Sequence, residues 1–255
     1  MSVNVWTHPE EYTTVTAPLV VVIHTIVGDT DVVLWRTNEN IQINLVGSSP
    51  LYGHILTHAC LYLAKYLENN ADTVVRGKSI LEVGAGGALP SILAARLGAQ
   101  YVVSTDYPDP DLIVNIRKNI TENNVQDNCS ALGYIWGNDT TEIVDMLKTN
   151  TDGSKSTFDT IILSDVIFNH SEHLKLLQTC RDLLTPNKGK ILVTFSPHRP
   201  KLYHADLQFF ETCQQDPFNF TPHFVEMQHW SPLFKDDTDE STVELRSRVY
   251  FYILD

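Results

Sequence analysis

Two kinds of apolar segment alternate along the chain from residue 79 onward. Short, continuous apolar runs are typical of strands buried on both faces of a parallel sheet. Between them, apolar residues recur every three or four positions, as on one face of a helix. The pattern predicts strands at 79–84, 101–105, 130–136, 158–164 and 190–195 and helices at 89–97, 111–123, 141–147 and 172–184. This alternation predicts a doubly wound, Rossmann-like α/β fold.

The C-terminal part lacks the alternation. A helix is predicted at 203–214, and two strands follow it at 224–230 and 243–254 with no helix between them. Antiparallel strands need no crossover helix. We therefore expect a hairpin at one edge of the sheet.

The first 50 residues have a different character. Residues 19–27 form an apolar, β-branched run, a turn is predicted at 28–29 before a strand at 32–35, and residues 41–45 alternate with period two. We expect a β-rich N-terminal extension over residues 1–50. An apolar stripe at 54–68 predicts an amphipathic helix at the start of the main domain, residues 51–255.

Composition narrows the functional classes. The 255 residues contain 18 Lys and Arg against 31 Asp and Glu, a net charge of −13, which argues against direct binding of nucleic acid. We expect no membrane span and no signal peptide, because the chain has no long apolar run and its start lacks a basic segment. The polar stretches at 149–156 and 235–241 are expected to be solvated loops.

The cysteines indicate a compartment. Four cysteines lie far apart without a C-x-x-C pair, and we expect buried thiols rather than disulfides or a zinc site. This usage suits the reducing cytoplasm, where we expect the protein to act as a monomer.

The most informative segment is a glycine-rich turn at residues 80–90, where an apolar strand runs through Gly84, Ala85 and Gly86 into a helix. Glycines allow the backbone to turn tightly and to approach a ligand closely. Asp106 follows about 20 residues later, at the end of the next strand, where a carboxylate can accept both hydroxyls of a ribose. This order predicts a nucleoside site.

Two nucleoside cofactors use such a turn. Dinucleotide sites favour a third small residue, but Leu89 stands there, and Glu82 would bring a carboxylate close to a pyrophosphate. S-adenosylmethionine carries an amine and a sulfonium and no phosphate, so we expect it as the cofactor. The E-x-G-x-G turn, the ribose acid and the terminal strand pair resemble the class I, seven-β-strand methyltransferases. The resemblance implies the sheet order 3-2-1-4-5-7-6 with the last strand antiparallel.

A second constellation follows the strand at 158–164. Asp165-Val166-Ile167-Phe168 resembles the D-x-x-[FY] signature of the protein-lysine branch of these methyltransferases. The resemblance implies that Asp165 holds an incoming ammonium and that Phe168 lines the acceptor channel, where an aromatic face attracts cationic nitrogen. We assign a proton relay to Asn169 or to water, and a cofactor contact to Ser164.

Further residues complete the predicted site. Trp136 lies in a W-G pair that resembles the one in related methyltransferases, and we expect it to cover the adenine. His170 and His173 have an i, i+3 spacing but no evident third ligand, so no metal site is predicted. His198, Arg199, Arg246 and Arg248 form a local basic group that either holds substrate carbonyls or pairs with acidic loops.

Several segments carry a narrower resemblance. They are residues 50–54, 105–111, 134–139, 164–170, 196–200 and 246–250. Together they resemble the fungal methyltransferases that modify translation elongation factor 1-alpha at its N-terminal amine and an adjacent lysine. The position where that family often has a tryptophan on the cofactor is Thr57 in this chain, and the first 45 residues differ from the family's proline-rich start.

We therefore expect an S-adenosylmethionine-dependent protein N-methyltransferase with elongation factor 1-alpha as its substrate. The first alternative is a small-molecule N-methyltransferase with a nicotinamide-like acceptor, which would have no need of the acidic Asp165. An NAD oxidoreductase and a non-catalytic binding module are the other two alternatives.

Overall fold

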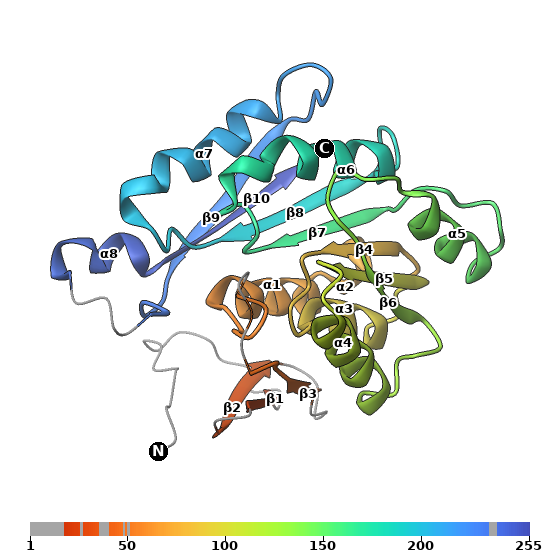
Figure 1. The fold of residues 1–255 in the computed structure, drawn as a ribbon, viewed down its shortest axis with the longest axis horizontal. Coiled ribbons are helices and arrows are strands. Elements are labelled where there is room, and N and C mark those ends of the chain that lie inside the picture. The colour runs from red at the N-terminus through yellow and green to blue at the C-terminus, as the bar shows by residue number, and fades with distance from the viewer. Residues whose placement is uncertain (1–17, 26–27, 36–40, 48, 50–51, 235–238) are drawn as a thin grey trace.

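The computed structural model describes residues 18–25, 28–35, 41–47, 49, 52–234 and 239–255, the first two of these ranges by their backbone alone. A seven-stranded sheet is the centre of the molecule (Figure 1). Its strands are β4 (Ser79–Val83), β5 (Tyr101–Asp106), β6 (Cys129–Gly133), β7 (Thr160–Ser164), β8 (Lys190–Phe195), β9 (Pro222–His229) and β10 (Arg248–Leu254).

The sheet has the order β6-β5-β4-β7-β8-β10-β9. The pairs within β6-β5-β4-β7-β8 are parallel, and β10 runs antiparallel to both β8 and β9. The sheet order that the resemblance implies and the edge hairpin that the residue pattern predicts are therefore both confirmed. Every residue of β4, β5 and β7 is buried, which explains why these strands are apolar runs without alternation.

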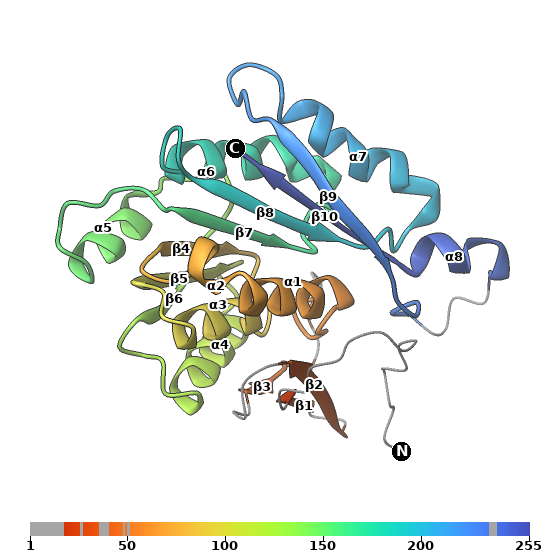
Figure 2. The same cartoon turned by 180° about the vertical axis from the view of Figure 1, so that it is seen from behind.

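Helices cover both faces of the sheet (Figures 1 and 2). One face carries α1 (His58–Asn69), α2 (Ala71–Val74), α3 (Leu89–Arg96) and α4 (Pro110–Glu122). The other carries α5 (Thr141–Thr149), α6 (His173–Leu183) and α7 (Tyr203–Thr212). Short helical turns occupy His170–Glu172, Pro200–Leu202 and Glu240–Thr242, and α8 spans Val243–Arg246. Among the described residues, no helix has the length and apolar character needed to cross a bilayer.

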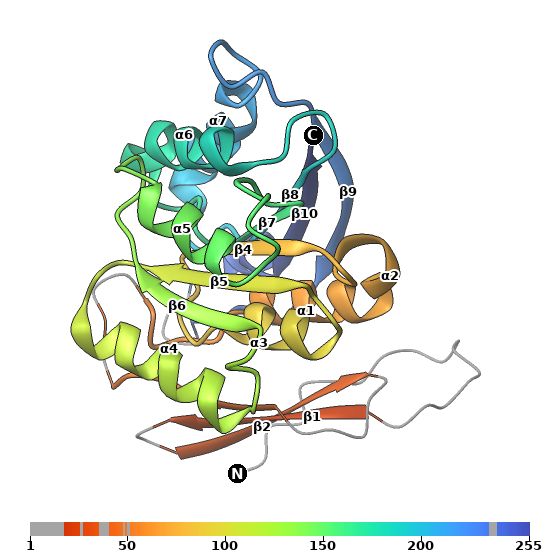
Figure 3. The same ribbon diagram turned by 90° about the vertical axis from the view of Figure 1, so that its right-hand side faces the viewer.

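The N-terminal strands form a second, small sheet that lies beyond α3 and α4 (Figure 3). Its order is β2 (Gly28–Trp35), β1 (Pro18–Thr25) and β3 (Ile41–Asn44), with β1 antiparallel to β2 and parallel to β3. Ile41 and Ile43 are fully buried in the same core as α1, α3 and α4. The sheet thus packs on the main fold through β3, and the domain boundary at residue 50 stays a prediction.

Buried amides of α4 hold β3 in place. Asn119, which is fully buried, accepts from the backbone N–H of Asn44 at 2.9 Å and donates to the Asn44 carbonyl at 2.9 Å. One turn later, Asn123 makes the same two kinds of bond with Gln42, at 3.1 and 2.6 Å. Two side chains spaced i, i+4 therefore take the place of a neighbouring strand along one edge of β3.

Several element boundaries differ from the prediction. The helix at 54–68 begins later because Thr57 caps α1, its Oγ1 accepting from the Cys60 N–H at 3.3 Å. The strand at 130–136 ends at Gly133, where a Cβ would lie 2.9 Å from Pro108 Cβ. The prediction of a turn at 28–29 is wrong, because Gly28 is the first residue of β2 and pairs with Thr25 of β1. The connection at 26–27 lies outside the described residues.

The strand at 243–254 is wrong over its first part, which forms α8. The Arg246 guanidinium donates to the Thr242 hydroxyl at 3.0 Å and to the Asp239 carbonyl at 3.1 Å, and these bonds favour a helical turn. Asp239 itself accepts from the Ser241 N–H at 3.1 Å, so this end of the acidic stretch is solvent-exposed, as predicted, and forms a capped turn. Residues 235–238 lie outside the described part.

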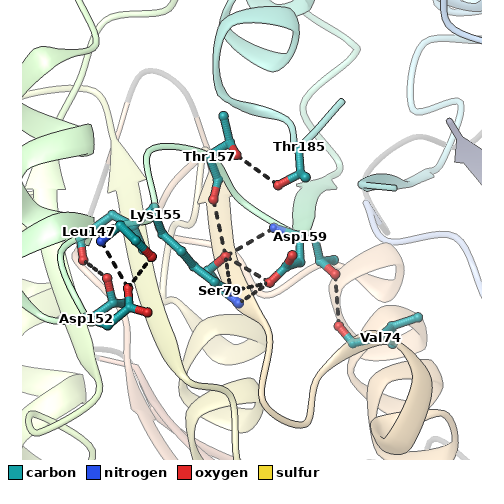
Figure 4. Close-up of polar contacts among 11 residues, drawn as sticks. Val74, Ser79, Leu147, Asp152, Lys155, Thr157, Asp159 and Thr185 are labelled. Atoms are coloured by element: carbon teal, nitrogen blue, oxygen red, sulfur yellow. Dashed lines mark hydrogen bonds and ion pairs between the residues drawn. The ribbon is translucent and has the colours of Figure 1, made fainter. Parts of the chain in front are cut away.

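The polar stretch at 149–156 is anchored at its end (Figure 4). Lys155 Nζ lies 2.8 Å from Asp159 Oδ2, and this carboxylate also accepts from the Ser79 N–H at 2.9 Å and the Ser79 hydroxyl at 3.0 Å. Burial opposes the charge on Asp159, but the bonds from Lys155 and Ser79 prevail and lower its pKa. These bonds connect the amino end of β4 with the amino end of β7, far from the carboxyl ends of the two strands.

We predict that Asp159→Asn lowers the free energy of unfolding by about 1–3 kcal/mol at pH 7, the usual cost of breaking hydrogen bonds to a charged group. The lowered pKa means that the charge stabilises the fold above the unfolded value of about 3.9. The difference from wild type should therefore shrink as the pH falls from 5 to 3. Urea unfolding at several pH values measures it.

Asp152→Asn is the matched control, because that carboxylate lies in the same loop, is fully exposed and bonds only locally with Ser154. It should change stability much less. Equal effects of the two substitutions, or a difference that does not depend on pH, would contradict the role given to Asp159.

Candidate active site

A cavity of about 530 Å³ opens at the carboxyl ends of β4, β5 and β7. Its volume lies in the range of small-molecule sites in proteins. The cavity is lined by all eleven residues predicted to bind the cofactor or take part in catalysis, namely Thr57, Glu82, Gly84, Ala85, Gly86, Asp106, Trp136, Ser164, Asp165, Phe168 and Asn169. The structure thus brings the predicted site residues together, while the role of each stays a prediction.

The turn after β4 depends on glycine. Gly84 and Gly86 have φ values of +78° and +55°, which residues with a side chain rarely adopt. A Cβ on Gly84 would lie 2.5 Å from Val166 Cγ1, so the loop after β7 packs directly against the turn. Because Gly84 and Gly86 have no side chains, the backbone of the turn itself lines the cavity.

Asp106 connects the ends of β4 and β5. Its Oδ2 accepts from the Gly86 N–H at 2.7 Å, and its Oδ1 accepts from the Tyr107 N–H at 2.7 Å. Burial raises the pKa of Asp106 against the effect of these two donors. Each carboxylate oxygen retains lone-pair capacity for a second donor, such as a ribose hydroxyl.

Glu82 lies on β4, two residues before Gly84, and is buried. Its Oε2 accepts from the N–H and the hydroxyl of Ser91 in the first turn of α3, at 3.0 and 2.5 Å. Burial raises the pKa of Glu82 to about 8, although the bonds from Ser91 act in the opposite direction. A cation in the cavity would favour the ionised form of this carboxyl.

Asp165 follows β7 with a φ of +57°, in the left-handed region that most side chains avoid. Its Oδ1 accepts from the Ser196 N–H at 3.3 Å, and its Oδ2 lies 2.8 Å from Nε2 of His198. Burial alone would lower the pKa of His198, but the adjacent Asp165 carboxylate outweighs it and raises that pKa. The strained backbone and both bonds fix the carboxylate at the cavity wall.

Aromatic rings surround this end of the cavity. The rings of Phe168 and Tyr52 pack edge to face with their centroids 5.7 Å apart, and the rings of Tyr52 and Phe234 do so with centroids 5.9 Å apart. Phe234 in turn contacts the His198 ring at 5.4 Å. We call Tyr52, Phe168 and Phe234, all of which line the cavity, the aromatic ring set. Together with Asp165 they form a wall suited to a cationic nitrogen.

The remaining predicted residues also line the cavity. Trp136 stands on the loop after β6 and is half-buried. Thr57 lines the cavity while it caps α1, and the buried Cys60 thiol, whose pKa burial raises, lies one turn further along that helix. Asn169 lines the cavity and accepts from the Ser171 hydroxyl at 3.2 Å.

The histidine pair at 170 and 173 has structural partners. His170 Nε2 lies 2.6 Å from Asp206 Oδ1, and His173 Nε2 lies 2.6 Å from the Ile167 carbonyl oxygen. Within the described ranges, no group of three or more His, Cys, Asp or Glu side chains is arranged to hold a metal ion. His173 is buried rather than part of an exposed loop.

The basic group divides into two pairs. Arg248 binds Glu244 Oε2 at 2.6 Å, and Arg246 binds the turn at Asp239. His198 and Arg199 line the cavity instead, and Arg199 donates to the Phe168 carbonyl. Loop pairing is thus correct for Arg246, whereas Arg248 pairs with Glu244 of α8, next to the acidic loop.

The N-terminal extension packs against the glycine turn through β3. A Cβ on Gly87 would lie 2.7 Å from Ile43 Cγ2, and Asn119 donates to the Gly87 carbonyl at 3.0 Å as well as to β3. One buried amide therefore joins the turn to the strand that precedes the main fold. The sequence contained no period or motif that linked Asn119 to the turn.

Sequence reasoning missed other lining residues. Tyr107 and Ile135 line the cavity next to Asp106 and Trp136, and Tyr52 lies in the segment 50–54 that carries the family resemblance, so sequence position was a usable signal for all three. Phe234 was missed because it lies far along the chain in an irregular segment. The sequence indicates His198 as a member of a basic group, but no motif or spacing predicts its contact with Asp165.

Comparisons with known proteins agree with this geometry. Residues 35–216 match the lysine methyltransferase family. A protein of Candida glabrata, named protein N-terminal and lysine N-methyltransferase EFM7, is 50% identical over 84% of this chain and 81% of its own. The protein of the same name from Schizosaccharomyces pombe is 37% identical over 98% of this chain and 93% of its own.

A solved structure supports the fold alone. The ribosomal protein L11 methylase from Lactobacillus delbrueckii superposes with a TM-score of 0.54 at 13% identity, covering 91% of this chain and 92% of the other. The family match, the relatives and the cavity together show the enzyme class and its methyl donor. The chain belongs to the lysine methyltransferase family and is a protein N-methyltransferase that uses S-adenosylmethionine.

Proposed function

We propose that this enzyme methylates the N-terminal amine of translation elongation factor 1-alpha, a lysine close to it, or both. The observation that carries the proposal is the Asp165 carboxylate, fixed among the aromatic ring set in the same cavity as the glycine turn. The names of the fungal relatives, which specify N-terminal and lysine nitrogens, support it. The net charge of −13 suits a basic segment of a protein substrate.

The cofactor end of the cavity fits S-adenosylmethionine. A turn without side chains at Gly84 and Gly86, and a carboxylate held by two backbone N–H groups, are the features that a nucleoside without phosphate needs. Asp106 would hold the ribose and Trp136 would cover the adenine, with Ala85, Thr57 and Ser164 around them. Bound there, the cofactor supplies a methyl group on a sulfonium. Glu82, on β4 just before the turn, would offset the positive charge of the cofactor.

The acceptor end fits an ammonium. Asp165 would bind its charge, and the faces of Phe168 and Tyr52 would add cation–π attraction, worth about 0.5–2 kcal/mol per ring. The same carboxylate also favours the protonated amine, so it contributes capture and orientation rather than deprotonation. Asn169 lies within this wall and can orient a water molecule.

The alternative acceptor is a small molecule such as a pyridine. A pyridine nitrogen carries no ammonium for Asp165 to bind, and the relatives are named for protein acceptors. We propose that the enzyme works in the cytoplasm, and the four buried, unpaired cysteines support a reducing compartment.

We predict that the wild-type enzyme adds methyl groups near the N-terminus of recombinant, unmodified elongation factor 1-alpha, as read by mass spectrometry. Asp165→Asn should slow transfer about 10–100-fold, because hydrogen bonds to a charged group are worth about 1.5–3 kcal/mol. The dissociation constant of S-adenosylhomocysteine should change little. Asp111→Asn, exposed on α4 and outside the cavity, is the control.

Two results would reject the proposal. One is transfer of labelled methyl groups to nicotinamide but to no protein in a cell extract. The other is an Asp165→Asn enzyme that methylates the factor at the wild-type rate.

We predict that binding of S-adenosylmethionine releases a proton. With a pKa of about 8, Glu82 is largely protonated in the free enzyme at pH 7. The positive charge of the cofactor favours the ionised carboxyl, so affinity should tighten as the pH rises from 6 to 8 and level off above it. Isothermal titration in buffers of different ionisation enthalpy counts the protons.

Glu82→Gln should remove most of this buffer dependence. Glu68→Gln, at a buried glutamate of α1 that does not line the cavity, should retain it. Identical proton release by wild type and Glu82→Gln would show that another group titrates.

A further inference from the structure

The cavity wall contains a histidine next to the acceptor carboxylate. His198 follows β8, lines the cavity and has a side chain that is 14% exposed. Its Nε2 lies 2.8 Å from Asp165 Oδ2, the carboxylate that we place against the incoming ammonium. A carboxylate accepts hydrogen bonds, so Nε2 carries the proton and Nδ1 is the ring nitrogen left to take another.

The reaction needs such a group. An ammonium has no electron pair with which to attack carbon, so it must lose a proton before transfer. With reference pKa values of about 7.8 and 10.4, a useful fraction of an α-amine is neutral at pH 7.5, but about one lysine in a thousand is. Asp165 makes this loss harder, and Asn169 has no titratable group.

We propose that His198, oriented by Asp165, accepts the proton of the substrate ammonium. This inference rests on the proposed function, because it assumes an amine at the acceptor end. Because Nε2 faces Asp165 and Nδ1 points away from it, a water molecule would carry the proton from the ammonium to Nδ1. The freed electron pair forms the new nitrogen–carbon bond as the carbon–sulfur bond breaks toward sulfur. The methylated amine leaves as a cation, and the proton passes from His198 to water.

The surroundings of the ring suit this role. Asp165 and Asp206 favour a charged His198, whereas Arg199 and His58 oppose it. These groups come from the loop after β7, from α7, from the loop after β8 and from α1. Burial lowers the pKa of His198 and the Asp165 carboxylate raises it, and the net shift is upward, toward the pKa of an amine.

Phe234 completes the arrangement. Its ring contacts His198 edge to face at 5.4 Å and also contacts Tyr52, so the imidazole belongs to the same wall as the aromatic ring set. The other histidine–carboxylate pairs do not share this position. Among the described residues, His170, His223 and His229 pair with Asp206, Asp255 and Glu244, and none of these three histidines lines the cavity.

His198→Gln tests the proposal, because glutamine can keep an N–H toward Asp165 but cannot accept a proton. Single-turnover transfer to unmodified elongation factor 1-alpha is followed by mass spectrometry from pH 6 to 9, with the two nitrogens scored separately. At pH 7.5 we expect the variant to lose about 100-fold or more on lysine, the usual contribution of a positioned acid or base. The loss on the α-amine should be smaller, and both losses should shrink as the pH rises.

His223→Gln is the matched control, since it breaks a histidine–aspartate pair of 3.1 Å on the outer strands, and it should behave as wild type. If His198→Gln fails to bind S-adenosylhomocysteine, His198→Ala with added imidazole replaces it. Restored transfer would then support the proposal, and no restoration would oppose it.

A merely structural role predicts equal losses on both nitrogens at every pH, and that result would overturn the inference. So would a wild-type rate in His198→Gln. Failure of the wild-type enzyme to methylate either nitrogen would instead reject the proposed function, and this inference with it.

Discussion

The site depends on the carboxylate of Asp106, which joins the ends of two neighbouring strands. By accepting from Gly86 on one side and from Tyr107 on the other, it fixes the glycine turn relative to β5. The turn then lies directly against the loop after β7, because Val166 leaves no room for a side chain at Gly84. Asp165 stands at the start of that loop. The cofactor end and the acceptor end are therefore positioned by one set of contacts at the carboxyl edge of the sheet.

The N-terminal extension belongs to this arrangement. Ile43 packs against Gly87, and Asn119 bonds both the Gly87 carbonyl and the backbone of β3. A buried amide left without these partners would cost about 1–3 kcal/mol for each unsatisfied group, so β3 and the turn stabilise each other. The part of the chain that least resembles the family's usual start thus supports the part that resembles it most.

Local order along the chain was enough to predict the strands and helices of the main sheet, its edge hairpin and one half of the site, whereas the order of the strands came from the family resemblance. The strand, glycine turn, helix and following Asp106 are close in sequence, and each is dictated by backbone geometry or by burial. Asp165 and Phe168 required the family signature as well. The pairing of His198 with Asp165, the position of Phe234 and the bridge through Asn119 join segments far apart in the chain, and no periodicity encodes such contacts. The helical turn at Val243–Arg246 was missed because bonds from Arg246 outweigh the strand preference of its neighbours.

The most direct measurement is the affinity for S-adenosylhomocysteine of the wild-type enzyme and of Asp106→Asn, by isothermal titration. The substitution leaves the shape of the side chain but removes the negative charge of the carboxylate, which accepts from both backbone N–H groups and which we propose to hold the ribose. We expect binding to the wild type and an affinity at least about tenfold weaker in the variant, for the loss of about 1.4 kcal/mol or more. Equal affinities, or no binding to the wild type, would contradict the central role of Asp106.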